Sequence, residues 1–250
     1  MEIWWLEQST AAMPAADDWL GPGEKLHLDS MRFPKRRADW RLGRWTAKRA
    51  VAAYLKLACD PEMLARIEIR SALSGAPEVL LDDHPAKVSL SITHRAGIAA
   101  CAFAPSEITI GCDLELIEPR TDAFLADYFT AGEQAFVMRV PAAERVVFSN
   151  LLWSAKESAL KALQAGLRLD TRCVEVSLRE TAAEGPLKDA TSASCYDTPH
   201  QIQDWHPLTV THEDGQCLQG WWQSTAELVR TIVTVPSTGA PRFLSLPPCG

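Results

Sequence analysis

Residues 108–118 read ITIGCDLELIE, and the alternation in this stretch decides how the second half of the chain folds. Every second residue from Ile108 to Leu116 is apolar, which is the period of a β-strand with one face on a core. The opposite face then carries Asp113 and Glu115, two positions apart. Carboxylates that crowd one side of a strand repel each other, so their charge needs compensation.

The segment before this strand has the same period. Residues 87–104, KVSLSITHRAGIAACAFA, alternate between apolar and small polar side chains and turn between His94 and Gly97. This pattern predicts a β-hairpin, followed by a boundary at residues 104–106.

Helices and further strands are expected after residue 118. Thr130 and Glu133 have the spacing of a capping box, which predicts a helix over 130–140. A second amphipathic helix is expected over 144–166 and can end at Gly166. Three later stretches have strand-like composition: residues 173–178, 207–222 and 228–236. The Pro-rich residues 237–250 are expected to be loose.

The first half of the chain has a similar order of elements. Residues 29–58 are strongly helical, with a break near Pro34. The other assignments are a strand over 2–6, a turn-rich connection over 14–29, and a strand–turn–strand unit over 65–81.

A short repeat links the two halves. WTAKRA at 45–50 and WSAKES at 153–158 are 108 positions apart, and each lies in an amphipathic helix. We therefore expect an α+β fold of two similar α/β halves, residues 1–105 and 106–250, related by a pseudo-twofold axis. Each half would be a small antiparallel-rich sheet packed against a long helix, and the active site would lie in the cleft between the halves.

Composition limits the possible partners. The net charge is −7 with a pI near 5.4, which argues against binding nucleic acid through its phosphates. The seven cysteines form no CxxC pair and are typical of reduced thiols. Neither a signal peptide nor a membrane-spanning run is visible, so we expect a cytoplasmic protein that contacts no membrane.

The helix over 144–166 carries Trp153, Glu157 and Lys161 on one stripe, at spacings of four residues. Taken alone, Glu157 and Lys161 are an ordinary surface pair, and Asp113 and Glu115 are an ordinary solvated strand face. Taken together, three carboxylates near one point would need a cation. Oxygen ligands with open positions suit Mg²⁺ or Mn²⁺, which also bind phosphate oxygens.

These motifs resemble those of the 4′-phosphopantetheinyl transferase superfamily, Sfp type. IGCDLE at 110–115 matches the family's G-x-D-x-E strand, and WSAKESALK at 153–161 matches its W-x-x-K-E-x-x-x-K helix. SITH at 91–94 matches a third motif, and residues 36–50 resemble the family's basic N-terminal helix. The resemblance covers about residues 30–178. It implies transfer of the phosphopantetheine arm of coenzyme A to a serine of an apo acyl carrier protein or peptidyl carrier domain, with release of adenosine 3′,5′-bisphosphate.

Residue roles follow from the resemblance. Asp113, Glu115 and Glu157 correspond to the metal ligands, with Asp113 also facing coenzyme A through the metal. Glu157 is the expected general base for the carrier serine. Lys161 is expected to contact the phosphate of the leaving group, and Lys156 is a weaker candidate for the same pyrophosphate. Trp153 is expected to anchor its helix in the core.

The 3′-phosphate of coenzyme A needs fixed positive charge. The resemblance assigns it to Arg36 and Arg44, eight positions apart on one helical stripe, and assigns a phosphate contact to His94 with Thr93 beside it. The remaining basic residues of this helix are expected to form a solvated face.

One position departs from the family pattern. Ala76 stands where many members have lysine before a proline, so one phosphate contact is missing or is supplied elsewhere, for example by Arg70.

Two other functions were weighed. A D…(D/E)-x-K nuclease needs a lysine two residues after its second acid, and Ile117 stands there instead. A non-catalytic scaffold that binds coenzyme A would not need all three acids and Lys161. The two-half length favours a monomer, but the sequence does not select a carrier from fatty-acid, polyketide or nonribosomal-peptide synthesis.

Overall fold

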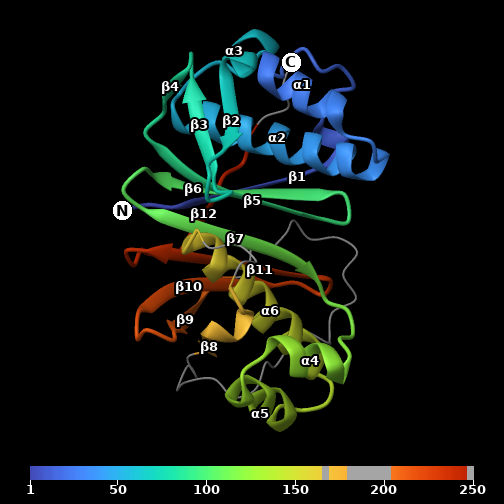
Figure 1. Cartoon of the computed structure of the whole chain (residues 1–250), viewed down its shortest axis with the longest axis vertical. Helices are drawn as coiled ribbons and strands as arrows, with labels where there is room; N and C mark the ends of the chain where they lie inside the picture. Colours follow the sequence, from blue (N-terminus) through green and yellow to red (C-terminus); the bar gives the residue numbers. More distant parts are fainter. Residues whose placement is uncertain (165–168, 179–203, 247–250) are drawn as a thin grey trace.

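The computed structural model describes residues 1–164, 169–178 and 204–246. Two sheets lie side by side across the middle of the molecule, with helices on their outer sides (Figure 1). The fold is mixed α+β and its sheets are mainly antiparallel, as the sequence predicts. Among the residues described, no helix combines the length and the apolar character that crossing a bilayer requires.

The N-terminal sheet has the strand order β12-β1-β6-β5. Its strands are β1 (Trp4–Ser9), β5 (Val88–Arg95), β6 (Ile98–Pro105) and β12 (Arg242–Phe243). The hairpin of β5 and β6 confirms the predicted one. The tail was expected to be loose, and this was wrong for β12, which pairs in parallel with β1. The backbone N–H of Leu244 donates to Trp5 O at 2.8 Å, so the end of the chain returns to the first sheet.

A small sheet and three helices cover the outer side of the N-terminal sheet (Figure 1). The sheet contains β2 (Ile67–Ser71), β3 (Pro77–Leu81) and β4 (His84–Pro85); the helices are α1 (Pro22–Ser30), α2 (Pro34–Tyr54) and α3 (Pro61–Arg66), with a 3₁₀ turn, η1, at Thr10–Ala12.

Helix α1 was missed, because its residues were assigned to a turn-rich connection. Pro22 occupies a first-turn position, where its missing N–H costs nothing. Glu24 then accepts a hydrogen bond from the Gly21 N–H at 3.0 Å, which caps the helix. The proline and glycines that suggested a turn therefore start a helix.

The C-terminal sheet has the strand order β7-β11-β10-β9-β8 and is antiparallel throughout. Its strands are β7 (Thr109–Leu116), β8 (Val174–Leu178), β9 (His206–His212), β10 (Cys217–Ser224) and β11 (Leu228–Val235). Its helices are α4 (Asp122–Tyr128), α5 (Ala131–Arg139) and α6 (Arg145–Ala162), with a 3₁₀ turn, η3, at Thr171–Cys173. The predicted capping box of Thr130 and Glu133 is present, whereas Gly166 lies outside the described residues.

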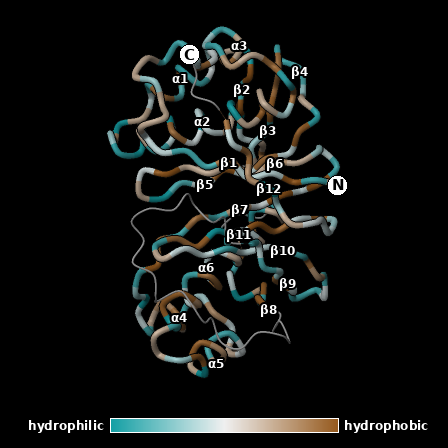
Figure 2. Tube along the Cα trace, turned by 180° about the vertical axis from the view of Figure 1, so that it is seen from behind, coloured by the Kyte–Doolittle hydropathy of each residue, from teal (hydrophilic) through white to brown (hydrophobic). Residues whose placement is uncertain are grey.

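The two sheets share an apolar core. Ile3, Trp5 and alternate alanines of β6 pack against Ile110, Cys112 and Ile232 of the other sheet. Figure 2 shows hydrophobic segments in the strands where the two halves meet. The predicted boundary after residue 105 coincides with the end of β6, although β12 belongs spatially to the first half.

Strand β7 is buried on both faces. One face meets the shared core and the other meets α6, so Asp113 and Glu115 lie under a helix rather than in open solvent. Gly111 permits the contact, because a Cβ there would lie 1.9 Å from Ser158 O. This close approach carries the acidic positions of β7 to α6.

Each long helix holds a fully buried lysine. On α6, Lys156 Nζ forms an ion pair with Glu133 at 2.8 Å and donates to the carbonyl oxygens of Thr171, at 2.9 Å, and Val174. On α2, Lys48 Nζ forms an ion pair with Glu24 and donates to the carbonyl oxygens of Trp19, at 2.9 Å, and Leu64, at 3.0 Å. Burial lowers the pKa of both lysines, and the paired carboxylate opposes that shift.

Candidate active site

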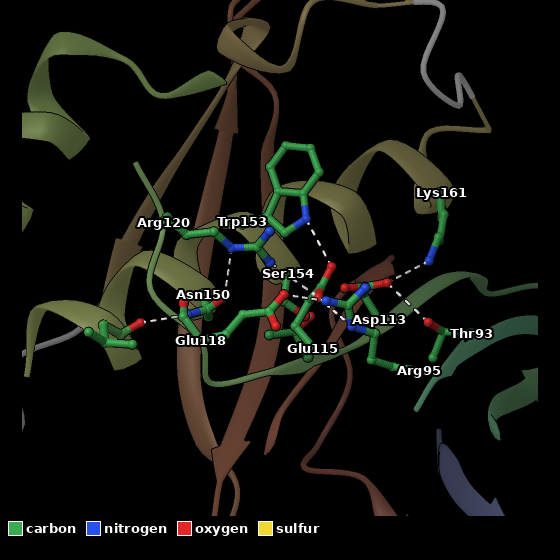
Figure 3. A network of polar contacts seen from close by, with 12 residues as sticks. Thr93, Arg95, Asp113, Glu115, Glu118, Arg120, Asn150, Trp153, Ser154 and Lys161 are labelled. Carbon is green, nitrogen blue, oxygen red and sulfur yellow. Dashed lines mark hydrogen bonds and ion pairs between the residues drawn. The ribbon is translucent and has the colours of Figure 1, made fainter. Parts of the chain in front are cut away.

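The acidic residues of β7 meet α6 at one end of the interface between the halves (Figure 3). Strand β5 of the first sheet lies beside β7: Ser91 Oγ accepts a hydrogen bond from the Cys112 N–H at 3.0 Å. The site is therefore built from both halves of the chain.

Asp113 is the most enclosed carboxylate, with 6% of its surface exposed. Its Oδ1 accepts hydrogen bonds from Lys161 Nζ at 2.9 Å and from Thr93 Oγ1 at 3.1 Å. Its Oδ2 is buried and has no hydrogen-bond partner in the described part of the chain. A buried carboxylate oxygen without a donor is costly, so it marks a position where a further positive group would be favourable.

Glu115 is held by three side chains. Trp153 Nε1 donates to Oε1 at 3.0 Å, Arg120 Nη2 donates to Oε2 at 3.2 Å, and Arg95 Nε lies 3.6 Å from Oε2. Burial nevertheless raises the pKa of Glu115, and the charge of Asp113 raises it further. The charges of the two carboxylates thus repel each other, as the sequence indicates.

Glu157 lies one turn before Lys161 on α6 and is partly buried. Burial raises its pKa; Asp113 and Glu115 raise it as well, while Lys161 lowers it. Within the described residues its carboxylate has no ion pair or hydrogen bond of its own. Burial acts to lower the pKa of Lys161, but Asp113, Cys112 and Glu157 together raise it above its ordinary value, so the ammonium stays charged.

The three carboxylates share one region but do not form a closed ligand group. Within the described residues, no three His, Cys, Asp or Glu side chains are placed to hold a metal ion together. Lys161 and the two arginines instead neutralise Asp113 and Glu115. Two observations still fit a hard divalent ion: the unpartnered Asp113 Oδ2, and the pKa values of Glu115 and Glu157, which burial raises first and repulsion between the carboxylates raises further.

A groove beside this region collects the predicted coenzyme A residues. Its volume is about 820 Å³, and its lining includes Arg36, Arg44 and His94. A neighbouring cavity of about 300 Å³ is lined by Arg44, Ala76 and Lys161, among others. Arg44 lines both hollows, and Lys161, which lines the smaller one, also donates a hydrogen bond to Asp113.

The basic residues of the groove differ in solvent exposure and in the contacts that hold them. Arg36 is exposed, and His94 Nδ1 lies 4.0 Å from Asp39 Oδ2. Arg44 packs over the Trp40 ring, with 4.9 Å between the guanidinium carbon and the ring centroid. Burial lowers the pKa of Arg44, and Glu24 opposes this. The groove therefore presents positive charge from an exposed side chain and from a fixed one.

The Ala76 turn leaves an open wall in the smaller cavity. Arg70, suggested as a substitute for the missing lysine, is exposed and forms ion pairs with Glu68 and Asp83. Neither of the two hollows has Arg70 in its lining. Arg44 and Lys161 line this cavity together with Ala76.

Two expectations need correction, and a third is extended. Lys156 is fully buried in its pair with Glu133, so it does not reach the site, and we no longer assign it to the pyrophosphate. Trp153 packs against the core of the second half, as expected, and its Nε1 also donates a hydrogen bond to Glu115. The basic face of α2 is only partly solvated, because Lys48 and Arg49 are buried.

Arg95 and Arg120 are site residues that the sequence reading missed. Arg120 also donates to Asn150 Oδ1 at 2.8 Å, and Arg95 also pairs with Glu118. The available signal was a basic residue at the end of β5 and another in the loop that follows β7. Ion-pair partners on separate segments cannot be read from spacing.

Comparison with known families bears on this arrangement. Residues 109–210 match the model of the 4′-phosphopantetheinyl transferase superfamily. This part of the chain is similar to that superfamily. The matched range contains Asp113, Glu115, Glu157 and Lys161. It begins after the groove residues on α2 and β5, which it therefore does not include. The family match supports a phosphopantetheinyl transferase in general. No curated protein matched the chain.

Proposed function

We propose that this protein transfers the 4′-phosphopantetheine arm of coenzyme A to a serine of an apo acyl carrier protein or peptidyl carrier domain, in the manner of the Sfp-type enzymes. Adenosine 3′,5′-bisphosphate would be released. The observation that carries the proposal is the junction of β7 and α6, where three carboxylates and Lys161 share one region and Lys161 lines a cavity together with Arg44.

The hollows suggest how coenzyme A lies. Arg36, Arg44 and His94 line the larger groove and would bind the 3′-phosphate, since arginine binds phosphate through paired N–H donors. Lys161 lines the smaller cavity and would bind the pyrophosphate nearer the acidic residues. This path runs from the first half of the chain to the second.

Asp113, Glu115 and Glu157 would hold Mg²⁺ or Mn²⁺. The bound ion would offset the charge that develops on the leaving phosphate. Lys161 and Arg120 already hold Asp113 and Glu115 in position by hydrogen bonds, so the chain orients these carboxylates.

Glu157 would act as general base. It is the one of the three carboxylates without a hydrogen-bond donor in the described residues, so an oxygen is available to accept the proton of the carrier serine. Its raised pKa makes it a better proton acceptor than an ordinary glutamate. Lys161 stays protonated beside Asp113 and would stabilise the departing phosphate oxygen.

We further propose that the two halves are related by a pseudo-twofold axis, with the active-site cleft between them and the protein working as a cytoplasmic monomer. The repeated buried lysines of α2 and α6 support this relation. The contact of Thr93 on β5 with Asp113 on β7 supports a site shared by both halves.

Intact-mass measurement of an apo carrier protein tests the proposal. The protein, coenzyme A and Mg²⁺ are incubated with several apo carriers at equal concentration. A mass gain of one phosphopantetheine, with release of adenosine 3′,5′-bisphosphate, is expected and should disappear with chelator. Coenzyme A binding without mass gain on any carrier would favour the non-catalytic scaffold.

A further inference from the structure

We propose that Lys156 is a positioning residue, which fixes α6 so that its neighbour Glu157 faces β7. The inference rests on the proposed function, since it concerns the same site. Lys156 would act through Glu133 and never touch coenzyme A, the metal or the carrier.

The contacts of Lys156 tie α6 to three other elements. Its ammonium pairs with Glu133 in the first turn of α5 and donates to carbonyl oxygens of η3 and β8. Glu133 is held in turn by the N–H groups of Thr130 and Val176, each at 2.8 Å. The pair is fully satisfied, so its geometry is fixed.

The same arrangement recurs in the first half. Lys48 pairs with Glu24 in the first turn of α1 and donates to two carbonyl oxygens. Glu24 is held by the N–H groups of Gly21, at 3.0 Å, and Ile69, at 3.1 Å. Each helix thus carries a buried lysine on a glutamate that caps a neighbouring short helix and bonds a neighbouring strand.

This repetition indicates a structural role that does not depend on the chemistry. Burying an ion pair stabilises a fold little compared with apolar packing, but it fixes orientation when every donor and acceptor is satisfied. Neighbouring residues on a helix point about 100° apart. Because Lys156 holds its side of α6 against α5, η3 and β8, Glu157 is turned toward Asp113 and Glu115. On α2, Lys48 would fix Arg44 in the same way.

The two lysines give different kinetic signatures. Lys156→Met is expected to weaken Mn²⁺ binding about tenfold or more, the usual cost of losing a group that orients metal ligands, and to lower kcat with little change in the KM for coenzyme A. Lys48→Met is the matched control. It should raise that KM and leave Mn²⁺ affinity unchanged, because its helix carries Arg44 rather than the carboxylates.

A double-mutant cycle separates positioning from direct contact. Lys156→Met alone leaves the charge of Glu133 buried and unpaired, which can prevent folding. The double variant Lys156→Met with Glu133→Gln removes both charges and avoids this problem. If Lys156 acts through Glu133, the effects on Mn²⁺ affinity are non-additive, and the double variant is no worse than Lys156→Met alone. Additive effects, or a raised coenzyme A KM with unchanged Mn²⁺ affinity, would overturn the proposal.

Mn²⁺ binding is measured by electron paramagnetic resonance without coenzyme A or carrier. Wild type that binds Mn²⁺, with variants that bind it equally well, would reject the positioning role alone. Wild type that binds no Mn²⁺ would reject the proposed function and the positioning role together.

Discussion

Helices α2 and α6 are built alike, but they present opposite chemistry. Both pack on a sheet through a buried lysine–glutamate pair, and both carry a tryptophan three positions before that lysine. Trp153 Nε1 bonds Glu115, whereas Trp45 Nε1 is buried without a partner in the described residues. At the position after the lysine, α6 has Glu157 and α2 has Arg49.

This difference teaches that the scaffold and the chemistry are separable. The shared features are buried and hold each helix in place. The features that differ are Arg36 and Arg44 of α2 and Lys161 of α6, which line the hollows, and Glu157 of α6, which lies one turn before Lys161. In the proposed function, the first half would bind the 3′-phosphate of coenzyme A, and the second half would perform the transfer.

The largest expected effect comes from Glu157 itself. Glu157→Gln removes the general base and one metal ligand, so kcat for transfer should fall by about 10²–10⁴-fold or more. Steady-state transfer monitored by carrier mass gives the value. A variant with full activity would remove Glu157 from both roles.

The glycines at the two helix contacts make a second comparison. A Cβ at Gly111 would lie 1.9 Å from the Ser158 carbonyl oxygen of α6, so Gly111→Ala should cost about 3 kcal/mol of unfolding free energy or more. Gly43 on α2 is the matched control: its Cβ would lie 3.2 Å from Ile92 Cγ2, a side-chain atom. Gly43→Ala should change stability by less than about 1 kcal/mol, since alanine favours the helix.

Urea unfolding of both alanine variants measures the difference. Equal destabilisation would mean that α6 and α2 approach their sheets at similar distances, which would contradict the close contact at β7.

Arg44 of the groove should affect the binding of coenzyme A rather than the transfer step. Arg44→Ala removes a charge-assisted phosphate contact, so the KM for coenzyme A should rise about 10-fold to 100-fold while kcat changes little. Arg70→Ala is the control, because Arg70 is exposed and paired outside the hollows. An unchanged KM in Arg44→Ala would place the 3′-phosphate elsewhere.

The smallest expected effect is that of Glu157→Gln on thermal stability in the absence of a divalent metal. The pKa of Glu157 is raised in the folded state. The folded protein therefore keeps the proton on Glu157 to a higher pH than the unfolded chain does. As pH rises through the raised pKa, the ionised carboxylate destabilises the fold. Glu157→Gln should therefore raise Tm in chelator at pH 8 and have less effect at pH 5. Thermal unfolding at both values checks the sign. A lower Tm at pH 8 would show that the ionised carboxylate is stabilised.

Strict local patterns predicted most of the sheet framework. Alternation gave β5, β6 and β7, and the spacing of Thr130 and Glu133 gave the start of α5. These features depend on neighbours in sequence. Strand β12 was missed because two residues in a Pro-rich tail pair only with the distant β1.

The site was predicted less completely than the strands. The acids and Lys161 were found because they lie in recognisable motifs. Lys156 was misassigned because its partner Glu133 lies on a separate helix, so nothing in the local spacing shows that the ammonium is buried. Arg95 and Arg120 were missed for the same reason.

A crystal structure with coenzyme A and Mn²⁺ tests the central claim most directly, through the anomalous signal of manganese. The account predicts one manganese bound by Asp113, Glu115 and Glu157 and by the pyrophosphate, with the 3′-phosphate beside Arg36 and Arg44. Manganese bound elsewhere, or coenzyme A bound with Lys161 still on Asp113 and no metal there, would contradict it.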